Sequence, residues 1–133
     1  MITKETGLGY DVSEAVAKLC DCDRMAAVVD RVGPCRLVAN KRLSLFAAMM
    51  RSITYQQLSG NAAGAIWRRA CGLYPNSRPR PELVAETDYE RLRKVGLSNA
   101  KTRSSKDLAE KTSDGTLPSR RLMKTMEDEA VID

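Results

Sequence analysis

Residues 45–59 have the sequence Leu45-Phe46-Ala47-Ala48-Met49-Met50-Arg51-Ser52-Ile53-Thr54-Tyr55-Gln56-Gln57-Leu58-Ser59, and this stretch decides the fold. Its apolar residues recur every three to four positions, which is the spacing of a helix that buries one face. The helix runs into two adjacent glutamines and a serine, and a second helix begins after them. Bulky uncharged amides therefore lie at an exposed corner between two helices, where they could enter a nucleic-acid groove.

The flanking sequence continues the helical pattern. Ser44 and Ser59 are good N-cap residues for the two helices that meet at this corner. A basic helix is expected over residues 99–111, with Ser98 before its first turn. No sustained two-residue alternation and no Asn-Gly hairpin signal is present, so we predict an all-α fold.

The composition limits the size of the protein and the kind of partner it binds. A chain of 133 residues is long enough for one domain or part of one. Lys and Arg outnumber Asp and Glu by 22 to 17, which gives a formal net charge of +5 and a pI near 9.2. This charge is compatible with a polyanionic partner but does not by itself establish one.

Cysteine and histidine usage argues against metal and redox chemistry. The chain has four cysteines and no histidine, and Cys20-Asp21-Cys22 is too tightly spaced for the usual zinc knuckle. We therefore predict no metal and no cofactor. Without histidine the commonest general base near neutral pH is also missing. No secretory signal or membrane span is found, so a cytoplasmic location is expected.

Several segments, taken in order, resemble the helix-hairpin-helix DNA glycosylases of the HhH-GPD superfamily, specifically the 3-methyladenine DNA glycosylase II group. The resemblance covers about residues 11–133. Its individual pieces are weak, but the ordered series is specific. The matching segments are Asp30-Arg31-Val32-Gly33-Pro34-Cys35, residues 45–53, Gln56-Gln57-Leu58-Ser59 with Ala62-Ala63, Val95-Gly96-Leu97-Ser98-Asn99-Ala100-Lys101, Asp107-Leu108-Ala109 and Met126-Glu127-Asp128-Glu129-Ala130-Val131-Ile132.

The resemblance implies a fold and a function. The fold would be the N-terminal helical portion of the glycosylase, with a flexible N-terminus at residues 1–10 and a partial helical domain at residues 11–133. The function would be base excision repair of alkylated purines in double-stranded DNA, in which the damaged nucleotide is flipped out of the stack. No membrane or metal is implied, and the sequence does not indicate a protein partner.

The resemblance also assigns a DNA-binding turn. The side chain that fills the hole left by the flipped nucleotide comes from the turn matching Gln56 and Gln57, and Gln57 is the better candidate by position. An amide suits this role because it is flat and can hydrogen-bond the orphaned base without a charge to desolvate. Ser59 is assigned to DNA binding with them. The alternative is that the two glutamines are ordinary exposed residues at a helix end with no role in DNA binding.

Further candidates lie on either side of this turn. Lys101 and Lys106 of the expected basic helix are assigned to phosphate binding, although an ordinary solvated basic face is an equal alternative. Tyr55 is assigned to the base pocket by stacking, yet a tyrosine at a helix end is as often at the rim of a core. By contrast, three arginines are interpreted as surface charge: Arg51, Arg68 and Arg69.

The family's Gly-x-Gly hairpin and the catalytic aspartate beyond it have no counterpart in these 133 residues. We therefore assign no catalytic residue and expect a chain truncated before the hairpin, unable to cleave by itself. The alternatives are a non-catalytic DNA-binding module and a small helical protein-interaction domain.

Overall fold

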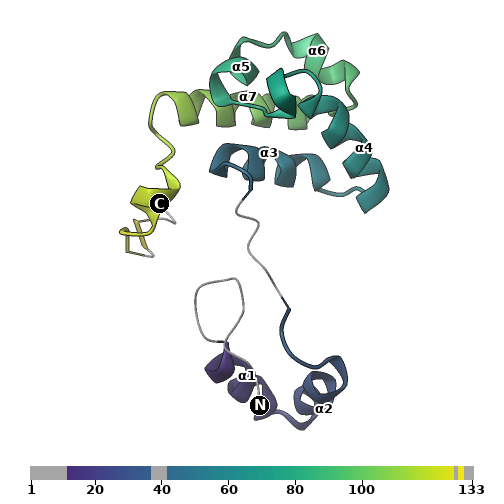
Figure 1. Cartoon of the computed structure of the whole chain (residues 1–133), viewed down its shortest axis with the longest axis vertical. Helices are drawn as coiled ribbons and strands as arrows, with labels where there is room; N and C mark the ends of the chain where they lie inside the picture. Colours follow the sequence, from purple (N-terminus) through teal and green to yellow (C-terminus); the bar gives the residue numbers. More distant parts are fainter. Residues whose placement is uncertain (1–11, 37–41, 128, 131–133) are drawn as a thin grey trace. The chain divides into compact units, whose positions relative to one another are not determined.

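The computed structural model describes residues 12–36, 42–127 and 129–130 (Figure 1). Within these ranges the regular structure is helical and no strand occurs, so the predicted all-α class is confirmed. The chain divides into two compact units, residues 1–42 and 43–133, which are considered separately. Residues 1–10 lie outside the described ranges, and a single partial domain over residues 11–133 stays a prediction.

The first unit contains a pair of packed helices, α1 (Ser13–Cys20) and α2 (Asp23–Val32). Asp23 places a carboxylate in the first turn of α2, where it complements the positive end of the helix dipole. Gly33 ends α2 with a φ of +80°, a backbone conformation that glycine adopts without steric cost.

The second unit contains the remaining described helices. Three of the serines before its helices accept hydrogen bonds from backbone N–H groups in the first turn, as expected of N-caps: Ser44 from Ala47, Ser59 from Ala62 and Ser98 from Lys101. Among the described residues, no helix has the length and apolar character needed to cross a membrane. The helices of this unit are α3 (Leu45–Tyr55), α4 (Gly60–Cys71), the short 3-10 helix η1 (Pro75–Ser77), α5 (Pro81–Glu86), α6 (Tyr89–Lys94), α7 (Asn99–Ser113) and α8 (Arg120–Met123).

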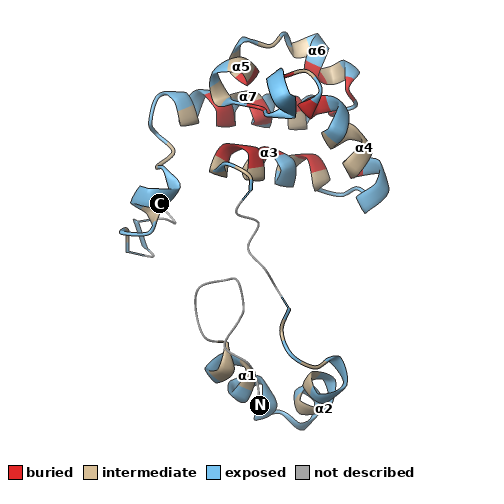
Figure 2. Ribbon diagram, viewed as in Figure 1, coloured by how far each residue is buried: buried red, intermediate tan, exposed pale blue. Residues whose placement is uncertain are grey.

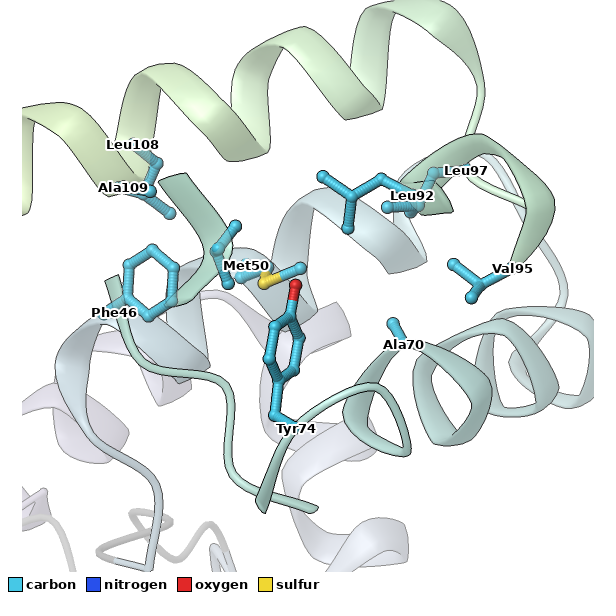
Figure 3. Close-up of a cluster of buried hydrophobic side chains, with 10 residues drawn as sticks. Phe46, Met50, Ala70, Tyr74, Leu92, Val95, Leu97, Leu108 and Ala109 are labelled. Carbon is cyan, nitrogen blue, oxygen red and sulfur yellow. The ribbon is translucent and has the colours of Figure 1, made fainter. Parts of the chain in front are cut away.

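Helix α7 is the centre of the second unit, because it packs against α3, α5 and α6. The buried residues of α3 and α7 lie on the sides that face each other (Figure 2). Small side chains at Thr102, Ser105 and Ala109 are fully buried on α7 and let neighbouring helices approach closely. The apolar core gathers around this face (Figure 3) and consists of Phe46, Met50, Ala70, Tyr74, Val84, Leu92, Val95, Leu97, Leu108 and Ala109.

Tyr74 shows how the core accommodates a polar atom. Tyr74 is 6% exposed, and its hydroxyl lies 3.2 Å from the hydroxyl of Thr87. Burial is the main cause that raises the pKa of Tyr74, while the hydrogen bond to Thr87 opposes that shift. The phenol therefore stays neutral and hydrogen-bonded inside the core.

We predict that the cysteines differ in reactivity. Cys71 is buried at the end of α4, and burial raises the pKa of its thiol, whereas Cys20 and Cys22 are exposed. Because the thiolate is the reactive species, Cys71 should react with an alkylating reagent only on unfolding. Timed alkylation followed by peptide mass spectrometry, with and without urea, measures this. Rapid labelling of Cys71 in the native protein would contradict its burial.

Candidate nucleic-acid interface

The turn between α3 and α4 holds Gln57 in an uncommon backbone conformation. Gln56 ends α3 with φ −55° and ψ 131°, and Gln57 follows with φ +55°. A left-handed conformation costs a residue with a Cβ about 1–2 kcal/mol. Strain of this kind persists only where the surroundings enforce it, and it is typical of functional sites.

The side chains of this turn are available to a partner. Gln56 and Gln57 are exposed, and Leu58 is 41% exposed although it is apolar. The hydroxyl of Ser59 accepts a 3.4 Å hydrogen bond from the backbone N–H of Ala62 and so serves the start of α4. The structure therefore brings together the three polar residues assigned to this corner and adds an apolar neighbour that the sequence analysis did not single out.

Lys101 reaches this turn from α7. Its ammonium donates hydrogen bonds to the carbonyl oxygens of Thr54 at 2.9 Å and Gln56 at 2.7 Å. Carbonyls at the end of a helix have no partner within it, and a lysine there both satisfies them and complements the negative end of the dipole. Lys101 therefore fastens the end of α3 to α7.

Lys106 fastens the end of α5 to α7 in the same way. Its ammonium donates to the carbonyl oxygens of Ala85 at 2.8 Å and Thr87 at 2.7 Å, at the end of α5. An ammonium has three N–H donors, so each lysine retains one for another ligand. Contact of Lys101 and Lys106 with DNA phosphates thus stays a prediction, whereas their contacts within the chain are direct.

Tyr55 lies on the side of α3 that meets α4. Its hydroxyl is 3.4 Å from the position that a Cβ on Gly64 would occupy, so the missing side chain of Gly64 makes room for it. The guanidinium of Arg51 lies 4.1 Å from the centre of the tyrosine ring, in cation–π contact. A terminal nitrogen of Arg68 is 3.8 Å from the same Cβ position. Two cationic groups thus lie near Tyr55, next to the Gln57 turn.

Arg51 and Arg68 are also exposed, and neither forms an ion pair among the described residues. In the described part of the chain the ion pairs are Arg80–Glu82 and Lys111–Asp107, and neither involves these two arginines. Arg69 differs from them, because its Nε donates a 2.9 Å hydrogen bond to the carbonyl of Val95. The sequence pattern does not distinguish the three arginines, which were all interpreted as surface charge. The four-residue spacing of Arg51 and Tyr55 was the signal that could have distinguished Arg51.

A groove of about 430 Å³ runs between α3 and α7. Tyr55 does not line it, because Tyr55 lies two residues from Ile53 and therefore about 200° around the helix. Asp107 is the one carboxylate among its described lining residues, and it is paired with Lys111 at 3.0 Å. The lining residues are Met49, Ile53, Gln56, Ser104, Asp107, Leu108, Lys111, Thr116 and Leu117.

The placement of Tyr55 bears on its assigned role. A base that stacks on the Tyr55 ring would lie beside Arg51, which already contacts that ring. It would not lie in the α3–α7 groove, because Tyr55 does not line that groove. Its assignment to a base pocket stays a prediction. Within the described ranges, no group of three or more His, Cys, Asp or Glu side chains is placed to hold a metal ion.

Comparison with known proteins finds one family. A family model described as HhH-GPD superfamily base excision DNA repair protein matches residues 50–132. The match includes the Gln56–Gln57 turn and all of α7. It therefore covers more than half of the chain, including Arg51, Tyr55, Arg68 and Lys101.

Two curated relatives and one solved structure come from Schizosaccharomyces pombe. Alkylbase DNA glycosidase-like protein mag2 is 28% identical over 126 residues, or 92% of this chain and 59% of the relative. DNA-3-methyladenine glycosylase 1 is 30% identical over 111 residues, or 83% of this chain and 48% of the relative. The structure of 3-methyladenine DNA glycosylase (Mag1) in complex with abasic DNA matches with a TM-score of 0.75 and 28% identity, over 89% of this chain and 59% of that one. The chain thus spans about half the length of the relatives it matches.

We predict that Gln57→Gly stabilises the protein. Glycine removes the left-handed penalty at φ +55° but loses more backbone entropy on folding, so the net gain in the free energy of unfolding should be about 0.5–1 kcal/mol. Gln56→Gly, one residue earlier at φ −55°, is the matched control and should destabilise. Urea unfolding compares the two. Equal destabilisation by both would show that Gln57 is not strained.

Proposed function

Because the chain belongs to the HhH-GPD superfamily of base excision DNA repair proteins, we propose that it acts on double-stranded DNA carrying alkylated purines, in a base-excision N-glycosylase function of the 3-methyladenine type. The names of its relatives support this substrate class. The observation that carries the proposal is the exposed turn in which Gln57 is held at positive φ.

Gln57 is proposed to fill the gap in the base stack when a nucleotide is flipped out. The flat amide can hydrogen-bond the orphaned base, and no charge has to be desolvated between the bases. Leu58 next to it supplies apolar surface of the kind that wedges between base steps. Gln56 and Ser59 border the same turn and are proposed to contact the DNA beside it.

Arg51 and Arg68 are proposed to bind the phosphate backbone. Both guanidiniums are exposed next to Tyr55, and neither is in an ion pair within the described ranges. Guanidinium groups match phosphate geometry and are weakly hydrated, so they give up solvent readily. Because these arginines lie close to the wedge, phosphate contacts there would fix its register on the duplex.

The proposed share of these 133 residues is DNA engagement rather than bond cleavage. The carboxylate in the α3–α7 groove, Asp107, is already paired with Lys111, and no other described lining residue is acidic. The proposal requires no metal or cofactor, since water is the co-substrate of a monofunctional glycosylase. The cytoplasmic location expected from the sequence stays a prediction.

One observation favours a second candidate, a helical protein-interaction domain. The groove between α3 and α7 has apolar lining from Met49, Ile53, Leu108 and Leu117, and its volume is typical of ligand sites. A protein segment with an apolar face would suit it. A folded chain that has no affinity for DNA would favour this candidate over repair.

We predict that Arg51→Ala combined with Arg68→Ala weakens DNA binding and its salt dependence. Each lost phosphate contact should reduce the slope of log K against log salt by about 0.9. Fluorescence anisotropy of a labelled duplex across a salt series measures the slope. Arg120→Ala with Arg121→Ala removes the same charge from α8, where Arg120 lies beside the opposite end of α3, and is the control. An equal change of the slope in both double variants would show that only the net charge of the protein matters, and not the position of Arg51 and Arg68.

We predict that the purified 133-residue chain binds DNA but releases no 3-methyladenine from alkylated DNA above the buffer control. Chromatography of the free bases after incubation measures release, with an active 3-methyladenine glycosylase as the positive control. Release at enzyme-like rates would overturn the proposal that these 133 residues bind DNA without cleaving the glycosidic bond. Absence of binding at low salt would overturn the DNA-directed function itself.

A further inference from the structure

We propose that Lys101 is a positioning residue for the Gln57 wedge. This inference rests on the proposed function, because it assigns Lys101 to the same turn. The ammonium holds two carbonyls that flank Tyr55, those of Thr54 and Gln56, and the second of these belongs to the peptide unit that continues into Gln57. Lys101 thereby sets the direction in which the Gln57 side chain leaves the backbone.

Lys101 can orient Gln57 directly because the peptide bond between Gln56 and Gln57 is planar. The carbonyl oxygen of Gln56 and the nitrogen of Gln57 lie in one rigid plane. A 2.7 Å hydrogen bond to that oxygen therefore fixes the plane from which the φ rotation of Gln57 begins. The carbonyl of Tyr55 is held as well, by the backbone N–H of Leu58 at 3.4 Å. Three consecutive carbonyls before the wedge are thus restrained, two of them by a single side chain.

The lysine is itself anchored to the core. Its backbone N–H donates to the hydroxyl of Ser98, the N-cap of α7, and the next residue, Thr102, is fully buried. Lys101 and Gln56 are 45 residues apart in sequence. The conformation of this exposed turn therefore depends on α7, the central helix of the second unit, as well as on hydrogen bonds within the turn.

Lys106 provides a matched control within the chain. It lies on the same helix, carries the same charge and donates to two carbonyls at the end of a helix, but that helix is α5 and its corner carries no wedge. If both lysines only stabilise helix ends, replacing either one should have the same effect on thermal stability and on selectivity for an abasic duplex. If Lys101 positions Gln57, only its removal should change the preference for an abasic duplex over an intact one, because a lost phosphate contact weakens binding to both duplexes alike.

The test compares Lys101→Met with Lys106→Met in the full chain. The probes are a duplex containing a tetrahydrofuran abasic-site analogue and an intact duplex of the same sequence. Selectivity is the ratio of the two affinities, and thermal unfolding is measured in parallel. We expect Lys101→Met to lower the selectivity about tenfold and Lys106→Met to leave it within about twofold, with comparable losses of thermal stability.

A double-variant cycle tests whether Lys101 acts through Gln57. Once Gln57→Ala has removed the wedge, adding Lys101→Met should cause no further loss of selectivity. A full additional loss would overturn the positioning role, as would a Lys101→Met protein that is destabilised but equally selective. If Lys101→Met does not fold, Lys101→Gln, which keeps one donor group, serves the same comparison.

A readout without DNA separates this inference from the proposed function. The backbone amide resonances of Gln57 and Leu58 should shift in Lys101→Met and remain in place in Lys106→Met. If they shift while the unmodified chain shows no selectivity for the abasic duplex, the wedge function fails and Lys101 still sets the turn. Unshifted resonances would overturn the positioning role whatever the DNA result.

Discussion

The second unit of this protein depends on how the open ends of its helices are satisfied. The last carbonyls of a helix lack internal donors, and leaving them unpaired near a packed interior is costly. Helix α7 supplies the missing donors through Lys101 at the end of α3 and Lys106 at the end of α5. These charged hydrogen bonds fix the ends of the two helices against α7, and the apolar contacts of Phe46, Met50 and Leu108 fill the space between.

The residues that stabilise the second unit are different from the residues of the exposed Gln57 turn. Most core residues lie in helices, and the burial of the core supplies the stabilising free energy. At Gln57 the chain departs from that pattern, with positive φ, an exposed amide and an exposed leucine beside it. A residue that breaks a local rule while its surroundings hold it in place is where a functional contact is expected.

Membership of a base excision repair superfamily gives these features a common interpretation. A wedge must keep its shape while it displaces a base, because a flexible side chain on a flexible turn would lose binding energy to ordering. A turn held by a core helix meets that requirement. The exposed arginines near Tyr55 are proposed to provide the non-specific attraction to the DNA backbone. The chain spans about half the length of the relatives it matches.

The sequence by itself determined the helical class, the serine caps before α3, α4 and α7, and the corner at Gln56 and Gln57. Those features depend on side-chain spacing and capping, which are local along the chain. It could not determine the carbonyl partners of the two lysines. The partners of Lys101 lie 47 and 45 residues away in the sequence, and those of Lys106 lie 21 and 19 residues away. Nor could the sequence separate Arg51 from Arg69. Only tertiary packing decided which cations face solvent and which meet a carbonyl, because that choice depends on helices brought together from distant parts of the sequence.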